Sequence, residues 1–157
     1  MPIEIGISTD LDLAYAHWFG RVELADFRKM FEDYLAGPEF RPGRREFCDF
    51  SELGELDVGF KQVWSALSMV NGAEDKSGPP TSCNIFAPQD TAYGVARMYQ
   101  SLAEFEGGVQ VKIFRREEDI LAALRLDVAS VKELRARCLR PTTMNAPQLG
   151  LLGEPDP

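Results

Sequence analysis

The sequence predicts a single α/β domain with a mixed, mostly parallel sheet that opens with an N-terminal β-hairpin. Short apolar segments with strand periodicity alternate with longer segments of helical periodicity, which is typical of βα repeats joined by right-handed crossovers. Two strand patterns also follow one another at the start of the chain, with only a turn between them. With 157 residues and 45% hydrophobic content, the chain can bury a full core without disulfides or metals.

The predicted hairpin consists of strands over residues 2–9 and 13–22, joined by the turn residues 9–12. Isoleucines at every second position give the first strand one apolar face. The second strand has two distinct faces. One carries Tyr15, His17 and Phe19, and the other carries Ala14, Ala16 and Trp18.

The βα repeats follow this hairpin. Strands are expected over residues 45–50, 82–87 and 109–113. Helices are expected over residues 24–36, 58–71, 91–105, 117–126 and 129–138. Asp57 is the expected N-cap of the second helix, and Asp90 or Gln89 that of the third. Phe105 is expected to complete the apolar stripe of the third helix.

The composition indicates one domain over residues 1–140. Residues 141–157 contain four prolines and few apolar side chains. We therefore expect a disordered or loosely docked C-terminal tail, with Leu149, Leu151 and Leu152 as its apolar anchors.

The net charge and the cysteine content exclude several classes of function. The net charge is −8, and the basic clusters at residues 41–45 and 115–116 lack interleaved aromatics, so we expect no nucleic-acid binding. Three cysteines with no CxxC pair and a single histidine, His17, predict free thiols, no zinc site and no cofactor. No signal peptide or bilayer-spanning segment is visible, so a cytoplasmic protein without membrane insertion is expected.

Three local patterns, together with the element order, resemble the SpoIIAA-like (STAS) family of anti-sigma-factor antagonist domains and their lipid-transfer-like relatives. Asp49-Phe50-Ser51 followed by Leu56-Asp57-Val58-Gly59-Phe60 is similar to the family's D-L-S…D-S-S-G-L segment. Asn84-Ile85-Phe86-Ala87 precedes a helix, and residues 109–124 resemble the closing strand and helix. The resemblance spans roughly residues 2–126 and implies a regulatory protein-binding role.

The chain departs from this family at the position of its regulatory phosphate. Regulatory members are phosphorylated on a serine of the D-S-S-G segment, whereas Val58 and Gly59 occupy the corresponding positions here. The resemblance therefore does not imply a phospho-switch. Ser51 lies nearby and is a candidate for modification, although a turn hydroxyl bonded to the local backbone is the alternative.

Loops at the carboxyl ends of parallel strands are the expected place for a partner or ligand site. The candidate residues there are Ser51, Asp57, Val58, Phe60, Asp90, Thr91, Tyr93 and Gly94. Tyr93 is outside the apolar stripe of its helix, and Gly94 would permit close approach of another chain or a ligand. The alternative is that Asp57 and Asp90 are ordinary helix caps.

Aromatic side chains also suggest an apolar pocket. Its candidate lining residues are Trp18, Trp64, Phe86, Tyr93 and Tyr99, with plain core packing as the alternative. No nucleophile motif or glycine-rich phosphate loop accompanies His17 or Cys48, so no catalytic residue is predicted.

Three functions follow, in order of preference. The first is a non-enzymatic regulatory module that binds a protein partner or a second copy of itself. The second is a carrier or sensor of a small apolar ligand, and the third is an enzyme of unspecified activity.

Overall fold

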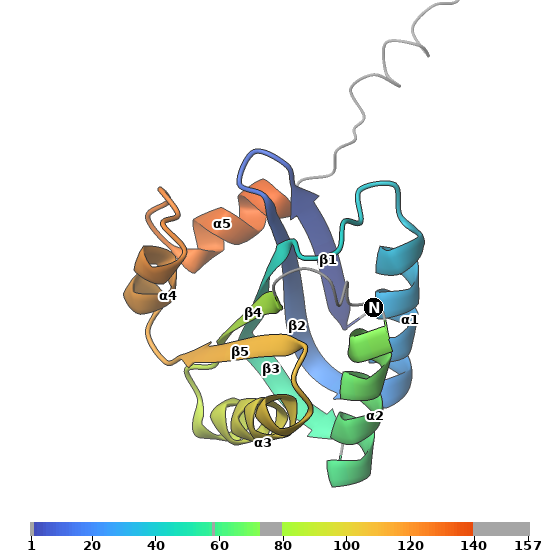
Figure 1. Cartoon of the computed structure of the whole chain (residues 1–157). Helices are drawn as coiled ribbons and strands as arrows, with labels where there is room; N and C mark the ends of the chain where they lie inside the picture. The colour runs from blue at the N-terminus through green and yellow to red at the C-terminus, as the bar shows by residue number, and fades with distance from the viewer. Residues whose placement is uncertain (1, 58, 73–79, 140–157) are drawn as a thin grey trace, which may run out of the picture.

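The computed structural model describes residues 2–57, 59–72 and 80–139, without the side chains of Asp57, Phe60 and Asn71. Five strands form one sheet in the order β1-β2-β3-β4-β5 (Figure 1). Their bounds are β1 Ile3–Ser8, β2 Leu13–Glu23, β3 Arg45–Asp57, β4 Thr81–Phe86 and β5 Val109–Phe114. β1 and β2 are antiparallel, and all later neighbours are parallel. The predicted mixed, mostly parallel sheet with an opening hairpin is confirmed.

Helices cover both faces of this sheet. Their bounds are α1 Leu24–Ala36, α2 Phe60–Gly72, α3 Asp90–Glu106, α4 Glu117–Ala123 and α5 Val131–Cys138. Buried side chains of α1, α2 and α3 share one apolar core with the sheet, and those of α4 and α5 share a second (Figure 1). The sheet is thus the middle layer of three.

The alternation predicted for β2 decides which core each side chain joins. Ala14, Ala16 and Trp18 belong to the core under α1–α3, whereas Tyr15 belongs to the core under α4 and α5. Both faces of the central strands are therefore covered by helices, as expected for parallel βα repeats.

β3 is longer than predicted, because it continues past residue 50 to Asp57. β4 pairs with β3 only as far as the Asp49–Phe86 pair, but the long β2 keeps pairing with the extension. The next helix starts at Phe60 and is preceded by Gly59, so Asp57 is not its N-cap and the prediction was wrong. Pairing with β2 extends the strand as far as Asp57, although the local sequence favours a helix cap at this residue.

α3 agrees with its prediction at its start and differs from it near its end. Gln89 occupies the N-cap position without a side-chain bond, and Asp90 lies in the first turn. Phe105 is 82% exposed rather than part of the buried stripe, whereas Leu102 and Ala103 just before it are buried.

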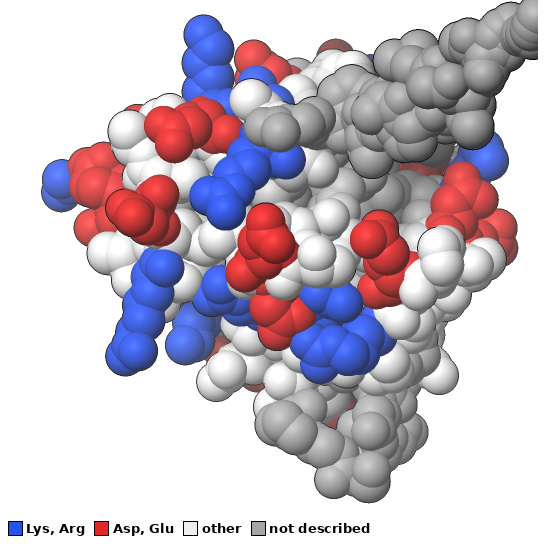
Figure 2. Space-filling view, turned by 90° about the horizontal axis from the view of Figure 1, so that it is seen from above, with Lys and Arg blue, Asp and Glu red and all other residues white. Residues whose placement is uncertain are grey.

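The basic cluster at residues 41–45 is used within the fold. Arg41 and Arg44 both pair with Asp12 of the hairpin turn, and Arg45 donates to the carbonyls of Leu11 and Leu124. Figure 2 shows basic and acidic side chains interspersed on the face seen from above.

Some predictions fall on residues without a described placement. The prediction of a tail over residues 141–157 lies outside the described residues, as does Val58. Within the described part of the chain, none of the helices has the length and apolar character that crossing a bilayer requires.

Candidate functional site: a cavity between the sheet and helices α1–α3

Small side chains lie next to one another at the centre of the sheet. Ala16 of β2 pairs with Cys48 of β3. Two positions earlier on β3, Glu46 pairs with Ala14 of β2 on one side and with Cys83 of β4 on the other. Four small side chains face the helices α1–α3 and line one cavity. We call them the floor: Ala14, Ala16, Cys48 and Cys83. Because these side chains are short, the sheet and the helices above it do not meet there.

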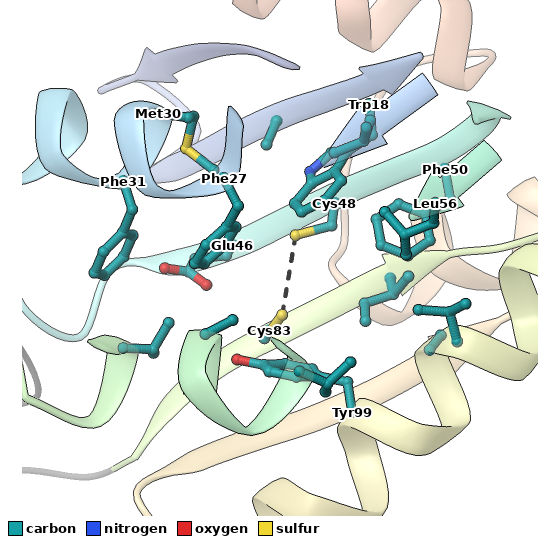
Figure 3. A pocket seen from close by; sticks show the side chains of 18 of the residues that line it. Trp18, Phe27, Met30, Phe31, Glu46, Cys48, Phe50, Leu56, Cys83 and Tyr99 are labelled. Carbon is teal, nitrogen blue, oxygen red and sulfur yellow. Dashed lines mark hydrogen bonds between the residues drawn. The ribbon is translucent and has the colours of Figure 1, made fainter. Parts of the chain in front are cut away.

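The resulting cavity has a volume of about 120 Å³. Its walls are mainly aromatic and aliphatic, with Glu46 as a carboxylate on one side (Figure 3). The aromatic wall residues are Trp18, Phe27, Phe31, Tyr34, Phe47, Phe50 and Tyr99. Cavities of this kind are where small apolar molecules bind in proteins.

The Trp18 ring forms part of this wall. Its side chain is buried, with ring centroids 5.9 Å from Phe27 and 5.1 Å from Phe50. Figure 3 shows the indole nitrogen on the side of the ring nearer to Phe27. Nε1 is buried and has no hydrogen-bond partner among the described residues. The atoms around Nε1 cover it almost completely, so this donor faces packed side chains and not the open space of the cavity.

Two thiols meet in the floor. The Sγ atoms of Cys48 and Cys83 are 4.0 Å apart, a contact drawn as a dashed line in Figure 3. Neither of them forms a disulfide bond, and Cys138 does not form one either. Burial raises the pKa of the Cys138 thiol, in the opposite core, to about 11.

The other face of the sheet holds a buried polar cluster, which we call the Asp49 network: Tyr15, Asp49, Ser51 and Arg135. Asp49 is fully buried and accepts hydrogen bonds from the Tyr15 hydroxyl, from Ser51 Oγ at 2.6 Å and from Arg135 Nη2 at 2.9 Å. Ser51 N–H adds a further bond of 2.9 Å. Both oxygens of this carboxylate are thus engaged within the chain.

These bonds decide the protonation state of the cluster. Burial by itself raises the pKa of Asp49, but the hydrogen bonds from Ser51, Tyr15 and Arg135 outweigh it and hold the pKa below its usual value. Burial and the Asp49 charge raise the pKa of Tyr15. Asp49 is therefore a carboxylate and Tyr15 a neutral phenol at neutral pH.

A β-bulge extends this cluster to His17. His17 pairs with Asp49 but Phe19 pairs with Glu52, so β3 carries one extra residue there. The bulge brings Glu52 Oε1 to 2.8 Å from His17 Nε2 and 3.2 Å from Arg135 Nη1. Sequence reasoning missed Arg135, since no local pattern indicates which part of the sheet α5 packs against.

Several residues of the predicted partner site do come together at a sheet end. Gln89 Nε2 donates to the Ser51 carbonyl at 2.8 Å, and Arg115 lies 2.7 Å from Asp90 and 4.5 Å above the Tyr93 ring. We call these five residues the edge cluster. Ser51 is partly buried, and its hydroxyl bonds to Asp49.

The remaining predicted site residues have fewer contacts. Thr91 and Gly94 are exposed, and beyond the adjacent turns of α3 no atom of the described residues lies within 4 Å of a Cβ built on Gly94. Close approach to Gly94 by another molecule stays a prediction. The side chains of Asp57 and Phe60 lie outside the described part of the structure, as does all of Val58.

The apolar pocket predicted from the sequence is present, but only some of the predicted aromatic residues line it. Trp18 and Tyr99 line the cavity. Trp64 and Tyr93 are partly buried against the same core without lining it, and Phe86 belongs to the opposite core. The floor escaped prediction, since small residues carry no strong periodic signal.

Comparisons with known proteins add a likeness of fold. A scan against family models and a search of curated proteins find no match. Among solved structures, the chain is similar to an uncharacterized protein of the DUF3478 family, with a SpoIIAA-like fold, from Shewanella loihica PV-4. The TM-score is 0.49 at 20% sequence identity, covering 78% of this chain and 91% of that one. Its SpoIIAA-like fold is the one that the sequence motifs resemble.

Proposed function

We propose that the protein binds a small apolar molecule in the cavity between the sheet and helices α1–α3, and acts as a carrier or sensor without turnover. The observation that carries this proposal is the apolar cavity of about 120 Å³ that the short side chains of the floor leave between the sheet and the helices. A core selected only for stability would be filled at this point, because each missing methyl group costs stability.

The size of the cavity restricts the ligand. An apolar cavity of about 150 Å³ holds benzene in another protein, so this one suits a molecule of similar or smaller size. A long acyl chain does not fit in this conformation. The resemblance to lipid-transfer-like proteins suggests a carrier of lipids, but the size of this cavity restricts the ligand to compact molecules.

Native mass spectrometry of the purified protein tests the proposal, followed by NMR titration with small cyclic hydrocarbons and ketones. Ala16→Leu places an isobutyl group in the cavity and is expected to abolish binding. Ala25→Leu is the matched control, because Ala25 is exposed on α1. Circular dichroism shows whether both variants fold. Equal binding by both folded variants would contradict a site in this cavity.

The edge cluster favours protein binding as a second candidate function. It presents the partly buried Tyr93 ring under Arg115 beside the exposed carboxylate of Asp90. Aromatic and arginine side chains are typical anchors of interfaces. Tyr93→Ala with Asp90→Arg should then reduce capture of a partner from extract, while Arg97→Ala on the same helix should not. Unchanged capture by the folded double variant would count against this surface.

A further inference from the structure

β1 forms one edge of the sheet, beside α1 (Figure 1). We propose that an extended, basic peptide segment of another protein adds to this edge as a further strand, in a groove between the end of α1 and the end of α5. This inference concerns the outer edge of β1 and does not depend on ligand binding in the cavity.

The pairing of β1 with β2 fixes which backbone groups face the open edge. Phe19 N–H donates to the Pro2 carbonyl at 2.9 Å, so these two residues form a hydrogen-bonded pair. The antiparallel register continues from this pair along β1 without a bulge. Bonded and non-bonded pairs alternate along such a ladder, so Ile5 and Ile7 belong to non-bonded pairs. Their N–H and C=O groups therefore point away from β2.

This edge is open from Ile5 onward. Ile3 is buried, whereas Ile5 and Ile7 are partly exposed. They line a groove of about 780 Å³, whose sides come from the end of α1, from residues 37–39 and from Leu139 after α5. An extended segment of about four residues spans the open part of β1, at roughly 3.3 Å per residue.

The opposite edge of the sheet is protected, whereas β1 is not. β5 carries Lys112, and its Val111 carbonyl accepts from Gln100 Nε2 of α3 at 3.0 Å. Lysine, proline and bulges are the usual protections of an exposed edge strand. β1 has none of them over its six residues. An unprotected edge of this kind is where a partner peptide adds through main-chain hydrogen bonds.

The walls of the groove select the charge of the partner. Glu4 of β1, Asp33 of α1 and Glu39 line it and are exposed, and no lysine or arginine is among its described lining residues. Lys29 lies 3.2 Å from Asp33, so Glu4 and Glu39 carry the excess charge. Lysine or arginine side chains of a partner strand complement these carboxylates. The β1 strand of a second copy would add another Glu4, and like charges on paired strands are destabilising.

A synthetic peptide, acetyl-Lys-Val-Lys-Val-Lys-amide, tests strand addition to the full chain. Two versions carry methyl groups on backbone nitrogens, either of both valines or of all three lysines. Only alternate N–H groups of a strand face its neighbour. One methylation pattern should therefore weaken binding about tenfold and the other should not, as measured by NMR titration of backbone amides. The unmethylated peptide should slow hydrogen exchange of the Ile5 and Ile7 amides, which exchange quickly in the free protein.

The charge of the groove is tested separately. The glutamate version, acetyl-Glu-Val-Glu-Val-Glu-amide, should bind about tenfold more weakly than the lysine peptide. Glu39→Lys should weaken binding of the lysine peptide. Glu104→Lys, at an exposed position of α3 outside the groove, makes the same change in net charge and should leave binding unchanged. Circular dichroism shows whether both variants fold.

Three results would overturn the inference. The first is the absence of binding, and the second is equal weakening by both methylation patterns or equal binding of the glutamate peptide. The third is slow exchange of the Ile5 and Ile7 amides in the free protein. With the native mass of one copy it would mean that the chain covers its own edge, and with the mass of two copies that a second copy does. None of these results bears on the cavity.

Discussion

At the scale of single residues, the Asp49 network is the strongest polar feature of the fold. It joins a buried carboxylate of β3 to Arg135 of α5, more than eighty residues later in the sequence. Arg135 is only 23% exposed in its side chain and also reaches Glu52. Hydrogen bonds that involve charged groups are worth more than neutral ones, and breaking them leaves Asp49 buried without its cation.

Arg135→Met should lower the free energy of unfolding by about 2–3 kcal/mol, because it removes the cationic partner of Asp49 and keeps most of the apolar stem. Urea denaturation measures this change. Lys132→Met, at an exposed position of the same helix, is the control and should change stability by less than about 0.5 kcal/mol. Equal effects of both substitutions would show that Arg135 contributes only as an exposed residue does.

Acid should weaken the fold through Asp49. Its pKa is lower in the folded protein than in the unfolded chain, so the folded state favours the carboxylate. This contribution is fully present above the unfolded pKa, about 3.9, and is lost as the pH falls through the folded value. Urea midpoints measured from pH 6 to pH 2 should therefore fall more steeply for the wild type than for Asp49→Asn. Parallel curves for the two proteins would contradict the assignment of this acid sensitivity to Asp49.

At the scale of elements, α5 is held against the sheet by a close backbone contact as well as by Arg135. A Cβ built on Gly6 of β1 would lie 2.1 Å from the carbonyl oxygen of Cys138, at the end of α5. Backbone atoms at that distance cannot give way as a flexible side chain can. The end of α5 therefore rests on a strand position that admits only glycine.

Gly6→Ala should destabilise the protein by about 1–3 kcal/mol, because α5 must move away from β1. Gly94→Ala is the opposite case, since open space surrounds that position inside α3. It should stabilise the protein by roughly 0.5–1 kcal/mol through helix propensity. Thermal denaturation compares the two, and a stabilising Gly6→Ala would show that α5 does not depend on this contact.

At the scale of the whole molecule, β2 and β3 contribute to both cores. Adjacent residues of β2, Ala14 and Tyr15, face opposite helical layers. Loss of either layer exposes one face of the same strands, so the two cores should unfold together. The cavity therefore lies in the shared middle of the molecule, not in a separable lobe.

A single cooperative transition is the expected result of urea unfolding. Tryptophan fluorescence reports the α1–α3 side, where Trp18 belongs to the core and Trp64 packs against it. Far-UV circular dichroism reports all helices, including α4 and α5. The two curves should superimpose with one midpoint. Separate midpoints would mean that the two layers fold independently.

Much of this architecture was predictable, because the periodicity of apolar residues in the sequence matches the face that each side chain buries in the fold. The alternation in β2 is enough to assign Trp18 and Tyr15 to opposite faces, since successive strand residues point to opposite sides of a sheet. Asp57 and Phe105 were mispredicted because capping and periodicity are local signals, whereas strand length and helix contact depend on distant partners. The Asp49 network was missed since its arginine comes from a helix whose position the sequence leaves open.

The sequence by itself determined the class of the fold, the opening hairpin and the faces of the strands, because side-chain periodicity of two or 3.6 residues is a property of the local backbone. Only the tertiary structure decided that Ala14, Ala16, Cys48 and Cys83 form one floor, since their adjacency depends on strand register. The cavity follows from that register, because a void belongs to the residues around it and not to any one segment.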